Sequence, residues 1–457
     1  MAKKRKGLLQ RFLDRYAAVR IGSSFAILDK ETAAEGRPFM TERTFESINK
    51  HIPRINECLV TSVWARDPTR EVYDKGVTFD PSGQHKKGVY NLWQGFPIEP
   101  IEGDCSAITK FLWQDICDKD ADGFQYLMTF FAHLIQFPGD KPGVALVLKG
   151  LKGVGKDTTI LLLRKLVGTH FAYATSTENI LGNFNIQLAQ ALFVHLEDAT
   201  WGGDPRAAKK LQGLITSETL RVEPKGIDAY TTPNFARLLL STNDDWAVPA
   251  SGGDERRYAV IQMPDHWADG SHRDKLWLDN KVHYFGRLYS AFEDPKVLSA
   301  WMFYLLNWQR EDGKGLKTAV RIPPRTAALA EQKASGFSGL DGFWFDLLTS
   351  GELPNQEEWT ETGVDFSPSE LLDHFHRWLR GRRGEGNPPS MKSLGKRLKK
   401  IAPSVVRARE TSGARGYYYQ LPAITLAREE FAQAHGISFE HLYDEEAQTD
   451  RDFSQLI

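Results

Sequence analysis

The sequence predicts an α/β fold in which a phosphate-binding sheet core lies between an N-terminal accessory domain and a C-terminal winged helix. At residues 144–168 an apolar run, a glycine-rich turn and an amphipathic stretch predict strand, loop and helix. Two further apolar runs, at residues 191–196 and 236–241, have the length of buried parallel strands. Near the C-terminus, helix-like segments precede two strand-like runs joined by a basic connection at residues 410–416, as in a winged helix.

The glycine-rich turn is the feature that points to a ligand. Glycines let the backbone turn tightly and direct its N–H groups inward, and the helix that follows presents its positive end to the same anion. A lysine in the turn adds a mobile positive charge. We therefore expect a nucleoside triphosphate, ATP, to be bound by Gly150, Gly153, Val154, Gly155, Lys156, Asp157 and Thr158.

One position departs from the usual phosphate-loop pattern. Asp157 follows Lys156, where a Ser or Thr normally offers a hydroxyl to Mg²⁺. Thr158, one place later, is the better candidate for that hydroxyl. Some small nucleotide kinases displace their Thr by one residue in the same way. The departure therefore weakens the assignment of the magnesium ligand more than the assignment of the phosphate-binding loop.

Polar side chains follow the next two apolar runs. Glu197 and Asp198 come directly after the first, where one carboxylate can hold Mg²⁺ and the other can polarise the attacking water. Asn243 follows the second and is suited to contact both the γ-phosphate and that water. Arg256 and Arg257 come next; they either stabilise transition-state charge across a subunit boundary or pair with the neighbouring acids.

This succession of a phosphate loop, strand-end acids, a strand ending in Asn and an arginine pair resembles the superfamily 3 helicases, over roughly residues 100–265. The closest resemblance is to the helicase module of phage and plasmid primase-helicases, relatives of the poxvirus primase-helicase. The resemblance implies an AAA+ ATPase that assembles as a homo-hexameric ring and moves along single-stranded DNA. It also implies a hairpin between the acids and Asn243 that contacts DNA through Arg221 and Lys225.

The chain also departs from that family. The two acids occur in the order Glu197-Asp198, whereas the family has Asp followed by Glu. This difference leaves their individual roles open. The N-terminal part shows no acidic-dyad and histidine pattern of a primase site, so we expect priming to be absent or supplied by a separate primase or initiator protein.

Bulk properties agree with a cytoplasmic protein. The chain has 457 residues, 41% of them hydrophobic, and a formal net charge of −1. Its three cysteines, Cys58, Cys105 and Cys117, have neither disulfide-framework nor zinc spacing. The basic N-terminus is followed by an amphipathic rather than a continuously apolar segment, so we expect neither a secretion signal nor a membrane partner.

Charge is unevenly distributed near the C-terminus. Residues 377–415 are strongly basic, and residues 440–452 are acidic, which predicts a polyanion partner for the basic segment. We expect duplex contacts from Lys396, Arg397, Lys399, Lys400 and Arg415. The predicted domains are an accessory domain (1–104), an ATPase domain with preceding helices and lid (105–330), a winged helix (339–425) and an acidic, partly disordered tail (426–457).

The function expected from these features is ATP-driven unwinding of single-stranded and forked DNA during replication of a phage, plasmid or mobile element. A nucleotide kinase would use the same phosphate loop but would need neither Asn243, the arginine pair nor a basic C-terminal domain. A non-catalytic replication initiator would keep the winged helix and lack ATP turnover.

Overall fold

The computed structural model divides the chain into two compact units. One comprises the described residues of Met1–Asn243 and Ile261–Pro323, and the other those of Asp244–Val260 and Pro324–Asp450. The residues described are 2–33, 38–52, 54–55, 57–174, 185–197, 205–243, 256–270, 273–355, 357–381, 390–409 and 417–437.

The central sheet has five strands in the order β13-β7-β12-β9-β8. Strands β7, β12, β9 and β8 lie in the first unit, whereas Tyr258–Val260 of β13 belong to the second. Strand β12 pairs in parallel with both β7 and β9, and β8 pairs in parallel with β9. The apolar runs predicted as buried parallel strands are confirmed as β9 and β12, which pair in parallel and are buried throughout except at Glu197. The strands are β7 (Ala145–Lys149), β8 (Phe171–Ala174), β9 (Phe193–Glu197), β12 (Arg237–Thr242) and β13 (Tyr258–Gln262).

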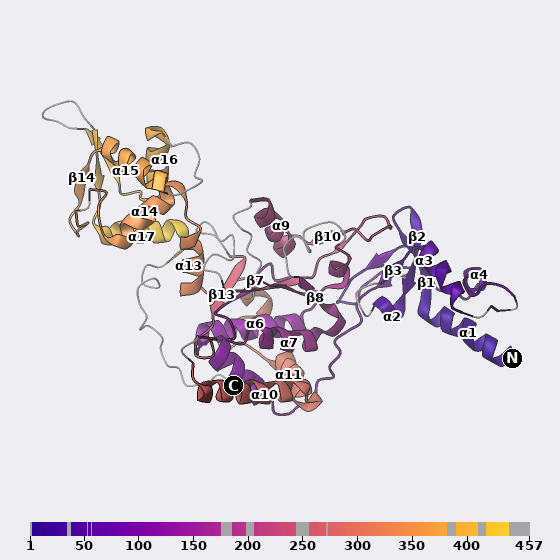
Figure 1. Ribbon diagram of the computed structural model, residues 1–457. Helices are drawn as coiled ribbons and strands as arrows, with labels where there is room; N and C mark the ends of the chain where they lie inside the picture. Colours follow the sequence, from indigo (N-terminus) through magenta and orange to yellow (C-terminus); the bar gives the residue numbers. More distant parts are fainter. Residues whose placement is uncertain are drawn as a thin grey trace. The chain divides into compact units, whose positions relative to one another are not determined.

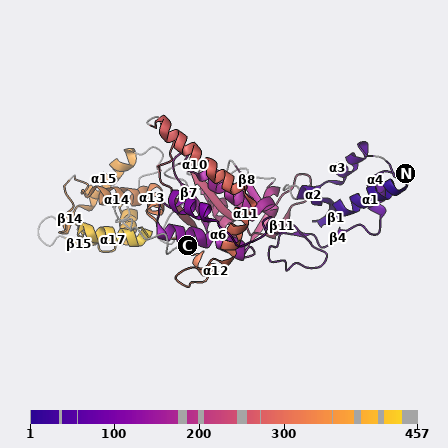
Figure 2. The same cartoon turned by 90° about the horizontal axis from the view of Figure 1, so that it is seen from below.

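Helices accompany this sheet, and Figure 1 shows α6 and α7 along one side of it. Both helices predicted between residues 106 and 137 are present, and Asp120 caps α6 by accepting from the backbone N–H of Asp122 and Gly123. Figures 1 and 2 show α10 and α11 side by side. The helices are α5 (Ser106–Phe111), α6 (Ala121–Gln136), α7 (Lys156–Val167), α9 (Pro205–Thr216), α10 (Lys275–Glu293), α11 (Pro295–Asn307) and α12 (Leu316–Ala319).

A buried guanidinium ties the start of β12 to the end of α6. Arg237 is 1% exposed and donates to the carbonyls of Phe137 at 2.8 Å and Asp140 at 2.7 Å. It also donates to Nδ1 of His133, whose Nε2 donates to the Asp140 carboxylate at 2.9 Å. Burial and the neighbouring Arg237 lower the pKa of His133 to about 3. His133 is therefore a neutral core histidine, as the sequence predicted.

The N-terminal residues form a smaller sheet with the order β3-β2-β1-β4. Residues 16–29 form an antiparallel hairpin, in which Gly22 adopts a positive φ of 62° and reverses the chain. Its elements are α1 (Ala2–Arg15), β1 (Tyr16–Ile21), β2 (Ser24–Asp29), α2 (Lys30–Ala33), β3 (Phe39–Met40), α3 (Glu42–Ser47), α4 (Val60–Arg66) and β4 (Val72–Tyr73), followed by the short pair β5 (Val77–Thr78) and β6 (Tyr90–Asn91).

A two-stranded hairpin lies between α9 and β12 along the chain. Strand β10 (Thr219–Val222) pairs antiparallel with β11 (Tyr230–Pro233), and residues 223–229 form its tip. This hairpin corresponds to the turn-containing ribbon that the sequence predicted before Asn243.

The second unit combines helices with a three-stranded sheet of order β14-β16-β15 around an apolar core. The predicted C-terminal helices and strand pair are present. The sequence missed β14 and α17; most of α17 lies within the segment 426–457 that the sequence predicted as an acidic, partly disordered tail. Phe431 of α17 is fully buried in the core. The elements are α13 (Ala327–Ser335), α14 (Gly339–Ser350), β14 (Val364–Phe366), α15 (Pro368–Gly381), α16 (Met391–Ile401), β15 (Val406–Arg409), β16 (Tyr417–Leu421) and α17 (Ile424–His435).

Among the helices that the structure describes, none has the length and apolar character needed to cross a membrane.

Replacing Arg237 with Met should lower the free energy of unfolding of the first unit by about 3 kcal/mol or more, since removing one partner of a buried charged network leaves the other polar groups unpaired. Chemical denaturation would measure the loss. The exposed Arg43→Met is the matched control and should change stability by roughly 0.5 kcal/mol or less. Equal effects of the two substitutions would contradict the structural role of the buried guanidinium.

Candidate nucleotide-binding site

The loop between β7 and α7 has the backbone geometry of an anion-binding turn. Gly153 and Gly155 adopt positive φ values of 85° and 109°, and α7 begins directly afterwards at Lys156. Only glycine adopts such angles without strain. The first N–H groups of a helix have no partner within the helix, so the start of α7 offers donors and positive potential to an anion.

Packing around the loop is close at both of these glycines. A methyl group at Gly155 would lie 3.3 Å from the Phe111 ring and 3.4 Å from the Phe285 ring. At Gly153 it would lie 2.5 Å from Nζ of Lys281, which is bonded to Asp269 at 2.6 Å. The loop is thus held between the α5 region and α10.

A buried carboxylate fixes α10 in this position. Asp115 accepts from Nε2 of His266 at 2.9 Å and from Nε1 of Trp267 at 2.7 Å, and the hydroxyl of Tyr284 donates to its other oxygen. The Trp267 and Tyr284 rings stack with their centroids 5.0 Å apart. Helix α10 therefore forms one wall of the loop.

Lys156 joins the loop to the neighbouring strand. Its ammonium donates to the carbonyls of Gly150 and Leu151, the latter at 2.9 Å, and to the side-chain oxygen of Asn243. The sequence predicted both residues for the site, and the structure brings them into contact. A phosphate group placed in the loop would compete with these neutral oxygens for the ammonium, and a charged acceptor forms the stronger hydrogen bond.

The strand register places Glu197 at the same edge of the sheet. Ser241 of β12 is paired with Glu197 of β9, and Thr242 is paired with Lys149 of β7. Strands β7, β12 and β9 are thus adjacent and parallel. They lead to the phosphate loop, to Asn243 and to Glu197, respectively. The hydroxyl of Tyr173, on β8, donates to the Glu197 carboxylate.

The two residues after Lys156 differ in exposure. Asp157 is exposed, whereas Thr158 is buried and its hydroxyl lies 3.2 Å from the Tyr289 hydroxyl of α10. A hydroxyl and a carboxylate are oxygen ligands of the kind that Mg²⁺ prefers, so Thr158 and Glu197 fit the predicted metal chemically. The residues described contain no group of three or more His, Cys, Asp or Glu side chains able to hold a metal by themselves.

Among the described residues, the strand pairing at this edge of the sheet does not include the remaining predicted catalytic residues. Asp198 lies outside the described residues. Arg256 is exposed and Arg257 is half-buried; both precede β13 and belong to the second compact unit. Sequence reasoning missed Tyr173 and Tyr289, because each comes from a distant element and no local pattern marks it.

The predicted DNA contacts are largely at the surface. Lys225 is exposed at the tip of the β10–β11 hairpin. Arg221, also exposed, donates to the Glu223 carboxylate at 3.1 Å. On α16, Lys396, Lys399 and Lys400 are exposed. Arg415 lies outside the described residues.

Arg397 differs from its predicted role on the basic helix. Its guanidinium makes two hydrogen bonds to Asp341 of α14, one of them at 2.6 Å. These hydrogen bonds raise the pKa of Arg397. The side chain holds α16 against α14 and does not present an uncommitted charge to DNA.

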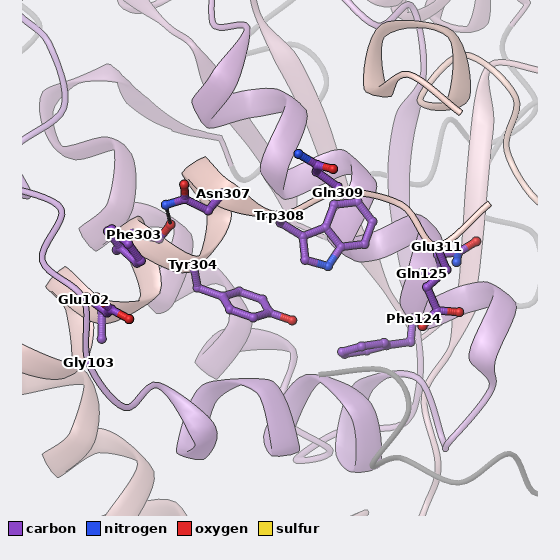
Figure 3. A pocket seen from close by; sticks show the side chains of 11 residues that line it. Glu102, Gly103, Phe124, Gln125, Phe303, Tyr304, Asn307, Trp308, Gln309 and Glu311 are labelled. Carbon is purple, nitrogen blue, oxygen red and sulfur yellow. Dashed lines mark hydrogen bonds between the residues drawn. The ribbon is translucent and has the colours of Figure 1, made fainter. Parts of the chain in front are cut away.

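A separate cavity of about 470 Å³ lies between α6 and α11. Figure 3 shows the rings of Phe124, Tyr304 and Trp308 around it, with Glu102 and Glu311 at its edges. Among the described residues that line it there is no Lys or Arg. This cavity lacks the charge that a triphosphate requires, so the glycine loop remains the candidate site.

Comparison with known proteins finds likeness to phage replication proteins. A model of a family of unknown function, DUF5906, matches residues 148–257, which include the phosphate loop, Glu197 and Asn243. The chain is 26% identical over 228 residues to the DNA primase-polymerase of Nitratiruptor phage NrS-1, covering 48% of this chain and 29% of that protein. The match thus spans less than a third of the relative's length.

Solved structures of the NrS-1 C-terminal region share the fold. One apo structure, of residues numbered 305–718 in that protein, has a TM-score of 0.61 at 16% identity and covers 92% of this chain and 98% of that one. An A-form apo structure of the same region gives a TM-score of 0.60 at 16% identity, with the same coverage. The chain is therefore similar over nearly its whole length to this mixed α/β region.

Proposed function

We propose that the chain is an ATP-dependent DNA helicase of the superfamily 3 type, which unwinds DNA during replication of a phage or related element. The observation that carries the proposal is the contact between Lys156 and Asn243 at adjacent strand ends beside Glu197. This arrangement supports an AAA+ type of P-loop core. The similarity to a phage primase-polymerase supports a role in DNA replication.

In this proposal the loop amides and Lys156 hold the β- and γ-phosphates of ATP. Thr158, Glu197 and Asp198 would hold Mg²⁺, which when bound would neutralise charge on the phosphate oxygens. Asn243 exchanges its contact with Lys156 for contacts with the γ-phosphate and the attacking water. Tyr173 orients Glu197 through the hydrogen bond that its hydroxyl donates.

Assembly as a homo-hexameric ring would complete the site. Arg256 or Arg257 of one subunit stabilises the transition-state charge on ATP bound by its neighbour, a role that needs a head-to-tail ring. Single-stranded DNA passes Lys225 and Arg221 of the hairpin, where a backbone contact needs charge but no base recognition.

The second compact unit supplies duplex binding. Its helices followed by the β15–β16 pair support the winged-helix interpretation, with the basic helix α16 bearing Lys396, Lys399 and Lys400. A separate primase or initiator protein would supply the primers.

A nucleotide kinase is the alternative that the displaced Thr158 favours. Phosphate transfer to a nucleoside monophosphate would establish it, whereas ATP hydrolysis stimulated by single-stranded DNA would exclude it in favour of the helicase. A non-catalytic initiator would bind forked DNA without any turnover of ATP.

Lys156→Ala should reduce ATP hydrolysis by about a hundredfold or more, since one preorganised charge contact to a transferring phosphate contributes roughly 3 kcal/mol to transition-state stabilisation. Glu197→Gln should retain bound ATP without hydrolysing it. Steady-state hydrolysis and nucleotide retention would be measured with Lys165→Ala as control, because Lys165 lies on the same helix but pairs with Glu293. Unchanged hydrolysis in Lys156→Ala would refute the site.

Arg256→Ala and Arg257→Ala, tested separately, should identify the residue that serves a neighbouring subunit. The responsible variant should bind ATP yet lose about a thousandfold or more in hydrolysis. Mixing it with Lys156→Ala should partly restore hydrolysis, since intact sites then meet intact arginines. Sedimentation under turnover conditions checks assembly, and a fully active monomer would contradict the ring.

Replacing Lys396, Lys399 and Lys400 with Ala should weaken duplex binding and reduce the log–log salt slope by about 0.9 for each lost phosphate contact. Arg397→Met is the matched variant: it should lower the thermal stability of the second unit, because the bond to Asp341 is lost, and should leave the salt slope nearly unchanged. Fluorescence anisotropy across a salt series measures the slopes. A slope change in Arg397→Met as large as that per lysine would overturn this division.

A further inference from the structure

The tip of the β10–β11 hairpin rests on the N-terminal sheet. Oδ2 of Asp228 accepts hydrogen bonds from the Ser23 hydroxyl at 2.9 Å and from the Ser23 backbone N–H at 3.3 Å. Ser23 lies in the β1–β2 turn, more than two hundred residues earlier in the chain. Figure 1 shows the hairpin beside this sheet.

Apolar packing extends the same contact. Ile227 and Tyr230 pack against a cluster formed by one face of the N-terminal hairpin. The Tyr230 ring also meets Phe39 of β3 edge to face, with centroids 6.2 Å apart. We name this cluster, together with Gly22 and Ser23, the anchor surface; its apolar members are Ala17, Val19, Ile21, Ala26 and Leu28.

Gly22 permits this close approach in two ways. Its φ of +62° is a conformation that L side chains rarely adopt, and a methyl group there would lie 2.8 Å from Oδ2 of Asp228 and 2.9 Å from its Cβ. The turn residue of the anchor surface is thus fitted to the hairpin tip by both backbone shape and space.

The end of β10 that leads into the tip is held by a second contact. The Asn185 side chain donates to the Arg221 carbonyl at 3.0 Å and accepts from the Glu223 N–H at 3.0 Å. Asn185 precedes a short 3₁₀ helix, Ile186–Gln190, that leads into β9, the strand ending in Glu197. The hairpin is therefore fixed both at its tip, to the N-terminal sheet, and where β10 meets the tip, to the segment before a proposed catalytic strand.

We propose that the N-terminal sheet positions the DNA-contacting hairpin. Asp228 and Tyr230 are the positioning residues. They keep Lys225 exposed, while Ile227 and Tyr230 pack against the anchor surface. The inference rests on the proposed contact of Lys225 with single-stranded DNA. It assigns to the N-terminal accessory region the regulation of that contact.

The physical reason is conformational entropy. An isolated two-stranded hairpin is marginally stable, and fixing a backbone residue costs about 1–2 kcal/mol. Without the anchor surface the seven-residue tip, residues 223–229, would sample many conformations, and DNA binding would have to order it. With the anchor surface, Lys225 is already held in place before DNA arrives.

The test uses matched pairs in the full chain. Gly22→Ala disrupts the contact, and Gly83→Ala is its control. Gly83 also has a positive φ, of 73°, but a methyl group added there would contact no atom within 4 Å. Tyr230→Ala removes the packed ring, whereas Tyr230→Phe keeps it and loses only a hydroxyl that has no hydrogen-bond partner among the described residues. Asp228→Asn retains an oxygen that accepts from Ser23.

Two measurements separate the contact from its consequence. Hydrogen exchange of residues 219–233 without DNA should become faster in Gly22→Ala and Tyr230→Ala and stay unchanged in Gly83→Ala, Tyr230→Phe and Asp228→Asn. Binding of single-stranded oligonucleotide should weaken in the first two variants, with the log–log salt slope reduced by up to about 0.7, the value for one lost phosphate contact on a single strand. Combining either with Lys225→Ala should cause no further loss, since the two act through one contact.

Exchange that stays slow in both disruptive variants would overturn the anchor surface. Faster exchange with unchanged oligonucleotide binding would overturn the positioning role, and so would additive losses with Lys225→Ala. If Lys225→Ala itself leaves oligonucleotide binding intact, the DNA role of the hairpin fails, and the positioning of that contact fails with it. The exchange result is independent of that failure, so the two can be told apart.

Discussion

The parallel alignment of β7, β12 and β9 is the constraint on which the candidate site depends. Because these strands run in one direction, the phosphate loop, Asn243 and Glu197 emerge at one edge of the sheet although they are far apart in sequence. The hydrogen bond between Lys156 and Asn243 is the direct consequence. A strand running the other way would place its polar residue at the opposite edge and separate these groups.

The charged group at the opposite edge of the sheet has a structural role. There Arg237 is buried and donates to backbone carbonyls at the end of α6, so its charge stabilises the scaffold. Burial lowers the pKa of Arg237 to about 9, which still leaves it charged near neutrality. Charged groups thus occur at both ends of the sheet, but only those at the carboxyl edge are arranged around a glycine loop that can accept an anion.

Much of the fold followed from local pattern. The strand, loop and helix at the phosphate loop, the helices before it and the helices of the second unit all carry periodicity that a short stretch of sequence displays. Three elements escaped. Strands β8 and β14 are short, and α17 is stabilised by burying Phe431 against residues distant in the chain.

The sequence by itself determined where an anion-binding loop can form, because Gly153, Gly155 and Lys156 lie within one short turn and their backbone and charge requirements are local. The tertiary structure decided which charged side chains are paired with a residue from a distant segment. Arg397 and Lys396 look alike on a basic helix, yet only the fold brings Asp341 to Arg397. The fold likewise brings Ser23 to Asp228. Such pairings depend on how distant segments pack, and no periodicity or spacing within one segment encodes the partner.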